Sequence, residues 1–148
     1  MDRVLFICTA NICRSPMAEA IFDALAEDRG LPLRAESAGT AALAGRPMAP
    51  EAVAALAEIG IYPEPHRARQ VSGGMLEEAE LVLVMTARHA AKVRQLRRDP
   101  PSGIHVLPEY ATGVPGDEIV DPYGYTITTY RNVLRQLYEY VGRVVDRM

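Results

Sequence analysis

The chain of 148 residues contains only two cysteines, Cys8 and Cys13, and no long apolar run. Two cysteines are too few for the disulfide framework of a small secreted domain, so we expect reduced thiols and a cytoplasmic protein. The apolar run at residues 4–7 is too short for a signal peptide, and no segment has the length needed to cross a membrane. The sequence therefore gives no reason to expect a membrane partner.

An excess of positive charge is also missing. The 16 Lys and Arg residues and 19 Asp and Glu residues give a formal net charge of −3. Domains that bind nucleic acid normally carry a basic face, so nucleic acid is not expected as a partner. A length of 148 residues with 49% apolar residues is typical of one globular domain, which we place at residues 1–148.

Two motifs that bind phosphate or metal are absent as well. The sequence has no Gly-x-x-x-x-Gly-Lys-Ser/Thr, the motif of P-loop NTPases. Its three histidines, His66, His89 and His105, are scattered and do not join the cysteines in a four-ligand cluster of the kind that binds structural zinc. We therefore expect neither a metal nor a cofactor.

What the sequence does contain is an alternation of strand and helix patterns. Four short apolar runs have the length of buried strands: residues 4–7, 33–38, 81–85 and 104–107. Four segments have apolar residues at helical spacing: the segment from Pro16 to Gly30, residues 49–59, residues 86–98 and residues 127–144. The alternation predicts an α/β fold with a central four-stranded parallel sheet and helices on both faces.

The segment after the first expected strand has the residues of an anion-binding loop. It begins at Cys8 and reaches Arg14 after five intervening residues, and Pro16 stands where a first helical residue is expected. A short loop that ends at a helix N-terminus directs backbone N–H groups at a common centre. The same electrostatic field favours the thiolate form of Cys8, and Arg14 can bind two phosphoryl oxygens at once.

This loop predicts phosphoryl transfer to a thiolate. Cys8 would be the nucleophile, and Arg14 would stabilise the charge on the equatorial oxygens of the transition state. The oxyanion would bind to the residues between them: Thr9, Ala10, Asn11, Ile12 and Cys13. Inorganic phosphate or another oxyanion would occupy the same loop as product or inhibitor. The alternative is that Cys8 is an inert buried thiol and Arg14 a surface charge at the start of a helix.

Three motifs of the chain resemble those of the low-molecular-weight protein tyrosine phosphatase family. They are Cys-x5-Arg-Ser-Pro-Met-Ala-Glu from Cys8, Ser-Ala-Gly-Thr at residues 37–40 and Asp-Pro-Tyr at residues 121–123, in the order found in the family. The resemblance covers essentially the whole chain. It implies that Cys8 is the nucleophile, Arg14 the phosphate clamp and Asp121 the general acid and then base, with a phosphorylated protein as the partner.

The resemblance also implies roles for five residues around these three. Ser15 resembles the hydroxyl that hydrogen-bonds the thiolate, and Asn11, Ser37 and His66 resemble the polar network that holds the loop in shape. Tyr123 would form one wall of the substrate slot, where its aromatic ring can stack on a phosphorylated aryl group. We expect the protein to act as a monomer.

Several departures from the family pattern bear on the substrate. Position 10 is Ala where Gly is common, residues 41–48 contain no aromatic, and Gly124 follows Asp-Pro-Tyr. Together with residues 109–113, these features resemble the bacterial branch that includes protein-arginine phosphatases. Those enzymes carry Thr at the position of Ile12, and a threonine hydroxyl can orient water beside a guanidinium leaving group, whereas Ile12 favours an aryl ring. Phosphotyrosine is therefore the expected substrate and phosphoarginine the alternative.

Cys13 has two compatible interpretations: it packs under the loop, or it traps oxidised Cys8 as a disulfide. A non-catalytic phosphate-binding or redox-sensing module is the alternative class of function. The Asp-Pro-Tyr motif at Asp121 argues against it, because a binding module needs no acid. Thioredoxin-linked arsenate reductases, which share the cysteine loop, use further cysteines, and none follows Cys13 here.

Overall fold

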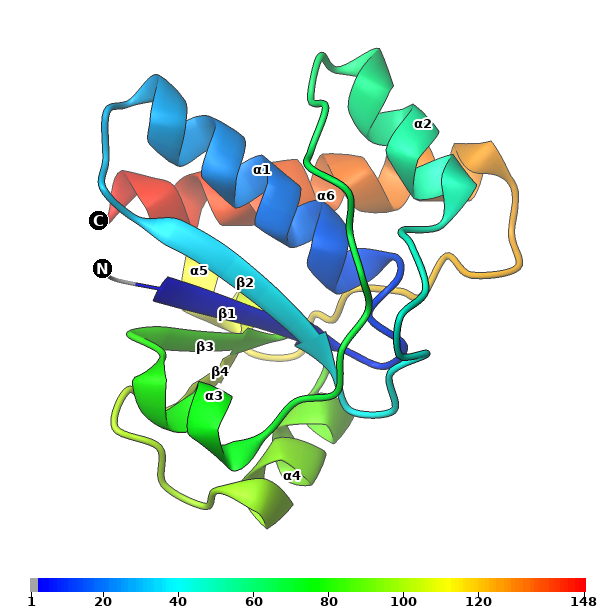
Figure 1. The fold of residues 1–148 in the computed structure, drawn as a ribbon. Coiled ribbons are helices and arrows are strands. Elements are labelled where there is room, and N and C mark those ends of the chain that lie inside the picture. The colour runs from blue at the N-terminus through cyan, green and yellow to red at the C-terminus, as the bar shows by residue number, and fades with distance from the viewer. Residues whose placement is uncertain (1–2) are drawn as a thin grey trace.

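Four parallel strands form the centre of the computed structural model, which describes residues 3–148 (Figure 1). They are β1 (Arg3–Cys8), β2 (Arg34–Gly39), β3 (Leu81–Val84) and β4 (Ile104–Val106), in the spatial order β2-β1-β3-β4. The register pairs Cys8 with Gly39 and Ile7 with Val84, so the carboxyl ends of the two central strands and β2 lie together. The predicted four-stranded parallel sheet is confirmed.

Within residues 3–148, six helices connect and cover these strands. They are α1 (Arg14–Asp28), α2 (Pro50–Glu58), α3 (Gly73–Glu78), α4 (Ala87–Leu96), α5 (Leu107–Thr112) and α6 (Ile127–Asp146). The four longest correspond to the four predicted helices. Neither α3 nor α5 was predicted, because six residues are too few to display a helical repeat of apolar positions. The predicted fourth strand was wrong at Leu107, which begins α5 and is followed by Pro108, a residue suited to the first helical turn.

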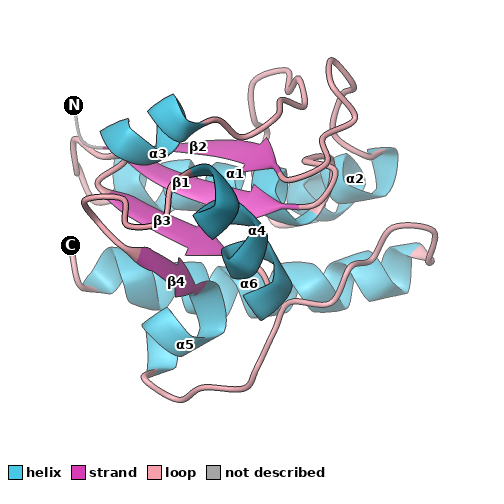
Figure 2. Cartoon of the chain, turned by 90° about the horizontal axis from the view of Figure 1, so that it is seen from below, coloured by secondary structure: helices cyan, strands magenta, loops and turns pink. Residues whose placement is uncertain are grey.

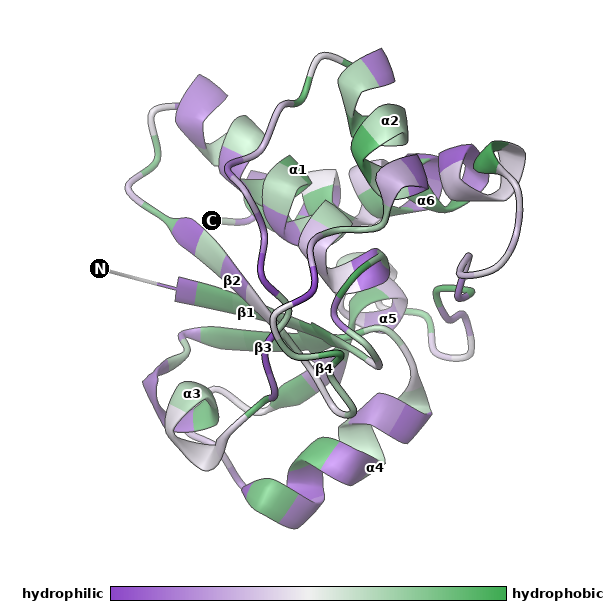
Figure 3. Ribbon diagram, turned by 45° about the vertical axis from the view of Figure 1, so that its right-hand side comes forward, coloured by the Kyte–Doolittle hydropathy of each residue, from purple (hydrophilic) through white to green (hydrophobic). Residues whose placement is uncertain are grey.

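The helices lie on both faces of the sheet, as Figure 2 shows from below. On one face Val4, Phe6 and Leu83 pack against apolar residues of α1, α2, α5 and α6. On the other face Leu5 and Val82 pack against α3 and α4. Alternate residues of each central strand therefore point to opposite cores, which is why β1 from Val4 on and the whole of β3 are hydrophobic (Figure 3). No helix in the described part of the chain is long and apolar enough to cross a membrane.

Helix α1 begins two residues before the position expected from the sequence. Cys13 is the N-cap, Arg14 is the first helical residue, and the Met17 amide donates to the Cys13 carbonyl at 3.1 Å. Pro16 is therefore the third helical residue and not the first. It is tolerated there because the first amides of a helix have no intrahelical acceptor. The earlier start places the Arg14 side chain at the mouth of the loop that follows β1.

Candidate active site

The loop between β1 and α1 directs its carbonyl groups outward. Five consecutive carbonyl oxygens, from Cys8 to Ile12, each accept a hydrogen bond from outside the loop. The donors, in order, are the amides of Thr40, Ala41 and Leu43, the Nε2 of His66 and the amide of Ala49, at 2.7–3.1 Å. A trans peptide points its N–H away from its C=O, and the described residues contain no cis peptide. The amides of residues 9–13 therefore face the inside of the loop, as an anion cradle requires.

Gly39 lets β2 approach this loop closely. A Cβ atom at Gly39 would lie 2.3 Å from the Thr9 carbonyl oxygen and 3.1 Å from the Asn11 Cβ. No side chain larger than hydrogen fits without moving the loop. Gly39 belongs to the Ser-Ala-Gly-Thr motif, so the motif has a steric basis in addition to its hydrogen bonds.

Asn11 lies at the centre of the hydrogen bonds that hold the loop. Its backbone has a φ of 61°, a left-handed conformation that Asn tolerates better than most residues. The buried side-chain amide donates to the Oγ of Ser15 at 2.8 Å and of Ser37 at 3.0 Å, and its oxygen accepts from the Arg69 amide at 3.0 Å. Ala10 has a negative φ, since Asn11 is the one non-glycine residue with a positive φ among those described. The methyl group of Ala10 therefore causes no backbone strain.

Ser15 brings a hydroxyl group to the cysteine. Its Oγ lies 2.9 Å from the Cys8 Sγ and 3.4 Å from the Ala38 carbonyl oxygen. Because the Asn11 amide donates to this Oγ, the single Ser15 proton can go to either the sulfur or the Ala38 carbonyl, and the sulfur is the nearer of the two acceptors. A thiolate can only accept a hydrogen bond, so this hydroxyl is placed to donate to an anionic Cys8.

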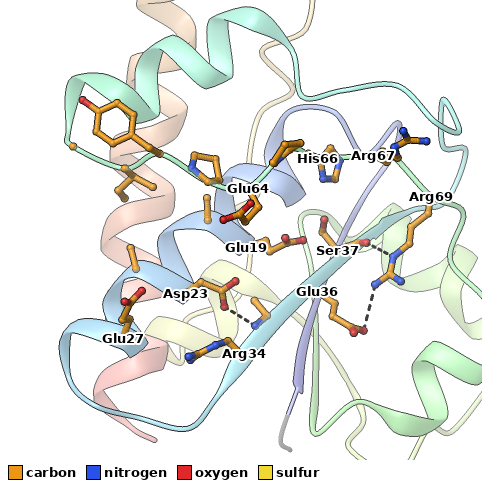
Figure 4. Close-up of a pocket in the computed structure, with 18 residues that line it drawn as sticks. Glu19, Asp23, Glu27, Arg34, Glu36, Ser37, Glu64, His66, Arg67 and Arg69 are labelled. Carbon is orange, nitrogen blue, oxygen red and sulfur yellow. Dashed lines mark hydrogen bonds and ion pairs between the residues drawn. The ribbon is translucent and has the colours of Figure 1, made fainter.

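Ser37 and His66 connect the loop to a cavity of about 760 Å³, drawn in Figure 4. Figure 4 places Glu19 beside Ser37, and Arg69 donates to the Ser37 carbonyl at 3.1 Å. Burial raises the pKa of Glu19, and its hydrogen bond with Ser37 opposes that shift. Burial lowers the pKa of His66, so the ring is neutral where it contacts the Asn11 carbonyl. Glu19 is the last residue of the Cys-x5-Arg-Ser-Pro-Met-Ala-Glu motif but was assigned no role from the sequence, and Arg69 was not predicted to take part.

Arg14 lies across the mouth of the loop and is held on both sides. Its side chain is only 6% exposed. Nη1 donates to the Ile119 carbonyl at 2.9 Å, and Nη2 lies 3.4 Å from the Thr9 Oγ1 and 3.6 Å from the Asp121 Oδ2. The backbone of residue 119 is itself tied to the end of β3, through its amide and the Met85 carbonyl at 3.0 Å. The guanidinium is thus held in one orientation by contacts on both sides.

These residues enclose a hollow of about 70 Å³. Its lining consists of residues 8–14 with Leu43, Asp121 and Tyr123. The Asp121 Oδ1 accepts the Tyr123 amide at 3.1 Å, while the carboxylate remains half exposed beside the hollow. Tyr123, 55% exposed, and Leu43 supply apolar walls. The role of Leu43 as a wall was not predicted, because residues 41–48 were considered only for an aromatic side chain.

His89 is a further residue of the site that the sequence analysis did not identify. It is 3% exposed, and its Nε2 lies 2.8 Å from the Thr9 Oγ1. Burial, together with the Arg14 charge, lowers the pKa of His89 to about 4. The sequence signal that could have identified His89 was its position three residues after Thr86. That position lies in the first turn of the helix that follows β3, the strand next to β1. From the sequence, His89 was considered only as a possible zinc ligand.

Cys13 packs beneath the loop. Its Sγ lies 3.4 Å from the Tyr130 hydroxyl, and burial raises the pKa of the thiol to about 11. Both Cys8 and Cys13 are free thiols. Among residues 3–148, no group of three or more His, Cys, Asp or Glu side chains is arranged to hold a metal ion.

The close approach at Gly39 gives a first prediction. In Gly39→Ala the new methyl pushes the loop from its donors, so we expect a loss of about 1–3 kcal/mol in the free energy of unfolding. We also expect a roughly tenfold weaker affinity for inorganic phosphate, measured by calorimetry, since hydrogen bonds of the cradle are displaced. Gly142→Ala is the matched control, because a Cβ in that helix meets no neighbour within 4 Å. Wild-type stability and phosphate affinity in Gly39→Ala would contradict this packing.

The neutral state of His89 gives a second prediction. An unfolded histidine takes up a proton near pH 6.5 and the folded one only near pH 4, so folding stability is lost as the pH falls between these values. The loss amounts to about 3 kcal/mol. In urea titrations, the free energy of unfolding of wild type minus that of His89→Gln should therefore fall by about 3 kcal/mol from pH 7 to pH 4. A difference that does not change with pH would show that His89 is not held neutral.

Comparison with known proteins agrees with this geometry. The family model for low molecular weight phosphotyrosine protein phosphatase matches residues 3–148. A protein-arginine-phosphatase of Bacillus subtilis is 35% identical over 98% of this chain and 95% of its own length. A low molecular weight protein tyrosine phosphatase from T. tengcongensis superposes with a TM-score of 0.93 at 36% identity, covering 100% of both chains.

A third comparison is with a solved structure of YwlE arginine phosphatase, a cysteine-to-serine variant with a phosphorylated active-site serine. It superposes with a TM-score of 0.92 at 34% identity and covers 98% of this chain and 94% of that one. Relatives of both substrate classes thus align along the whole chain. The chain belongs to the low molecular weight phosphotyrosine protein phosphatase family, which includes protein-arginine phosphatases.

Proposed function

We propose that this protein hydrolyses phosphotyrosine in protein substrates through a phosphocysteine intermediate on Cys8. The observation that carries the proposal is the set of five outward-held carbonyls, which leaves the amides of residues 9–13 facing a hollow that also contains Cys8 and Arg14. Amides and a guanidinium stabilise the three equatorial oxygens of a phosphoryl group in transfer. Cys8, which is buried and lines the same hollow, would be the nucleophile.

In the first step the Cys8 thiolate attacks phosphorus, and the bond from phosphorus to the tyrosine oxygen breaks. Asp121 donates a proton to that oxygen, so that tyrosine leaves as the neutral phenol. The Asp121 carboxyl supports this role because it is half exposed beside the hollow. It can therefore face the tyrosine oxygen of a substrate that binds from solvent. Ser15 holds the sulfur for the attack and stabilises the thiolate when it is released.

In the second step water attacks the phosphocysteine. The Asp121 carboxylate takes a proton from that water, the sulfur–phosphorus bond breaks, and inorganic phosphate and the Cys8 thiolate result. One carboxyl group serves both steps because the second reverses the proton transfer of the first. The phosphorylated serine in the related YwlE variant supports a covalent intermediate at the equivalent position of this family.

Phosphotyrosine is favoured over phosphoarginine by the walls of the hollow. Ile12 is 5% exposed and lines the hollow together with Leu43 and Tyr123. Such walls suit a flat aryl ring better than a polar guanidinium group. The arginine phosphatase of Bacillus subtilis is nevertheless among the similar proteins, so phosphoarginine remains the second candidate substrate.

We further propose that the protein acts as a cytoplasmic monomer of a single domain, 1–148, and that its partners are phosphorylated proteins and not nucleic acid or membranes. A net charge of −3 and the presence of two free thiols support this setting. Inorganic phosphate, as product, and similar oxyanions, as inhibitors, would bind in the cradle of residues 9–13.

The proposed roles of Cys8 as nucleophile and Asp121 as general acid give a third prediction. Cys8→Ser should lose turnover of an aryl phosphate in the presence of a chelator, because a serine hydroxyl attacks phosphorus far more slowly than a thiolate and a phosphoserine, once formed, releases phosphate poorly. Asp121→Asn should lose about 10²–10⁴-fold with a poor leaving group and far less with a good one, measured as kcat. Asp117→Asn, in the same exposed loop, is the matched control. Equal losses of Asp121→Asn with both leaving groups would count against the acid role, and oxyanion binding without any wild-type turnover would favour a binding module.

The fourth prediction concerns the substrate. Wild type should hydrolyse a phosphotyrosine peptide at least about tenfold faster than a phosphoarginine peptide, compared as kcat/KM, and Ile12→Thr should shift the ratio toward phosphoarginine. The threonine hydroxyl supplies a polar contact that the isoleucine lacks. A wild type that prefers phosphoarginine would overturn the substrate assignment and leave the covalent mechanism in place.

A further inference from the structure

We propose that His89 is a positioning residue for the reaction, acting through the Thr9 hydroxyl to hold the Arg14 guanidinium in the orientation that binds the phosphoryl group. This inference rests on the proposed phosphatase function. It assigns a role to a buried polar residue that lies outside the Cys-x5-Arg, Ser-Ala-Gly-Thr and Asp-Pro-Tyr motifs.

His89 is fixed by contacts at both of its ring nitrogens. Nδ1 lies 3.0 Å from the Thr86 Oγ1, and Nε2 lies 2.8 Å from the Thr9 Oγ1. The Thr86 Oγ1 also accepts the His89 amide at 3.2 Å as the N-cap of α4. With one contact toward the helix and one toward the loop, the ring connects the N-terminus of α4 to Thr9, the first residue of the oxyanion cradle.

The neutral ring suits this connection. Burial, aided by the Arg14 charge, lowers the pKa of His89 to about 4, so at neutral pH the ring carries a single proton. A charged ring in this place would repel Arg14. A neutral ring has one donor and one acceptor, and both neighbours are hydroxyl groups that can take either role.

Thr9 transmits the restraint to Arg14. The guanidinium can only donate, and its Nη2 lies 3.4 Å from the Thr9 Oγ1. The same nitrogen lies 3.6 Å from the Asp121 Oδ2, so its two protons have acceptors on both sides, the Thr9 hydroxyl and the Asp121 carboxylate. With the Thr9 hydroxyl held by His89, Nη2 stays over the loop. Without that restraint it would turn toward Asp121 and pair with the group that must protonate the leaving oxygen.

A purely structural role for His89 predicts a different pattern of variants. The side-chain nitrogen of Gln is as many bonds from Cα as Nε2 of histidine, and that of Asn as many as Nδ1. His89→Gln can therefore keep the contact with Thr9, whereas His89→Asn can keep the contact with Thr86. If His89 only stabilises the start of α4, the Asn variant is the better substitute. If His89 positions Arg14 through Thr9, the Gln variant is the better substitute.

The test compares these two variants in full-length protein. Both kcat/KM for an aryl phosphate and the dissociation constant for inorganic phosphate, by calorimetry, are measured. We expect His89→Gln to stay within about threefold of wild type and His89→Asn to lose about tenfold in both quantities. Equal values for the two variants, or better function in the Asn variant, would overturn the proposal. If the wild type showed no turnover, the proposed function would be refuted. The phosphate dissociation constants of the two variants would still test the role of His89.

Thr9→Val gives a second, independent measurement that leaves α4 untouched. It should weaken phosphate binding about tenfold, and adding His89→Asn should weaken it no further, because both changes remove the same contact. Wild-type phosphate affinity in Thr9→Val, or losses that multiply in the double variant, would show that His89 does not act through Thr9.

Discussion

The candidate site depends on one constraint: the carbonyl groups of residues 8–12 are held outward by donors that belong to other parts of the chain. The segment after β2 supplies four of these donors and His66 the fifth. An isolated loop of this length could direct its amides anywhere, but a loop whose carbonyls are all occupied has its amides turned inward. The parallel pairing of β1 with β2 makes this possible, because it brings Gly39 directly against Thr9 and Asn11.

The same constraint connects the site to the rest of the fold. Asn11, the left-handed residue of the loop, is held through Ser15 by α1, through Ser37 by β2 and through Arg69 by the segment before α3. Arg14 is held through the backbone of residue 119 by the end of β3. Each neighbouring strand therefore contributes a support at its carboxyl end, where parallel α/β sheets bind ligands.

Much of this could be predicted from the sequence. Apolar runs gave the four strands, and helical spacing gave the four longer helices, because each of these elements buries a continuous face. The loop chemistry followed from Cys8 and Arg14 at the end of the first strand. Elements of six residues, α3 and α5, were missed since they are shorter than two helical turns. His89, Leu43 and Gly39 acquire their roles only through contacts between distant segments, which spacing along one chain does not reveal.

The central claim is that the amides of residues 9–13 form the oxyanion site. The most direct measurement is a titration of ¹⁵N-labelled protein with inorganic phosphate, followed by amide chemical shifts. The account predicts that these five amides shift together, with one dissociation constant, and that the Arg14 side-chain signal follows them. Shifts confined to residues around the cavity of Figure 4, at Arg67 and Arg69, with the loop amides unchanged, would contradict it.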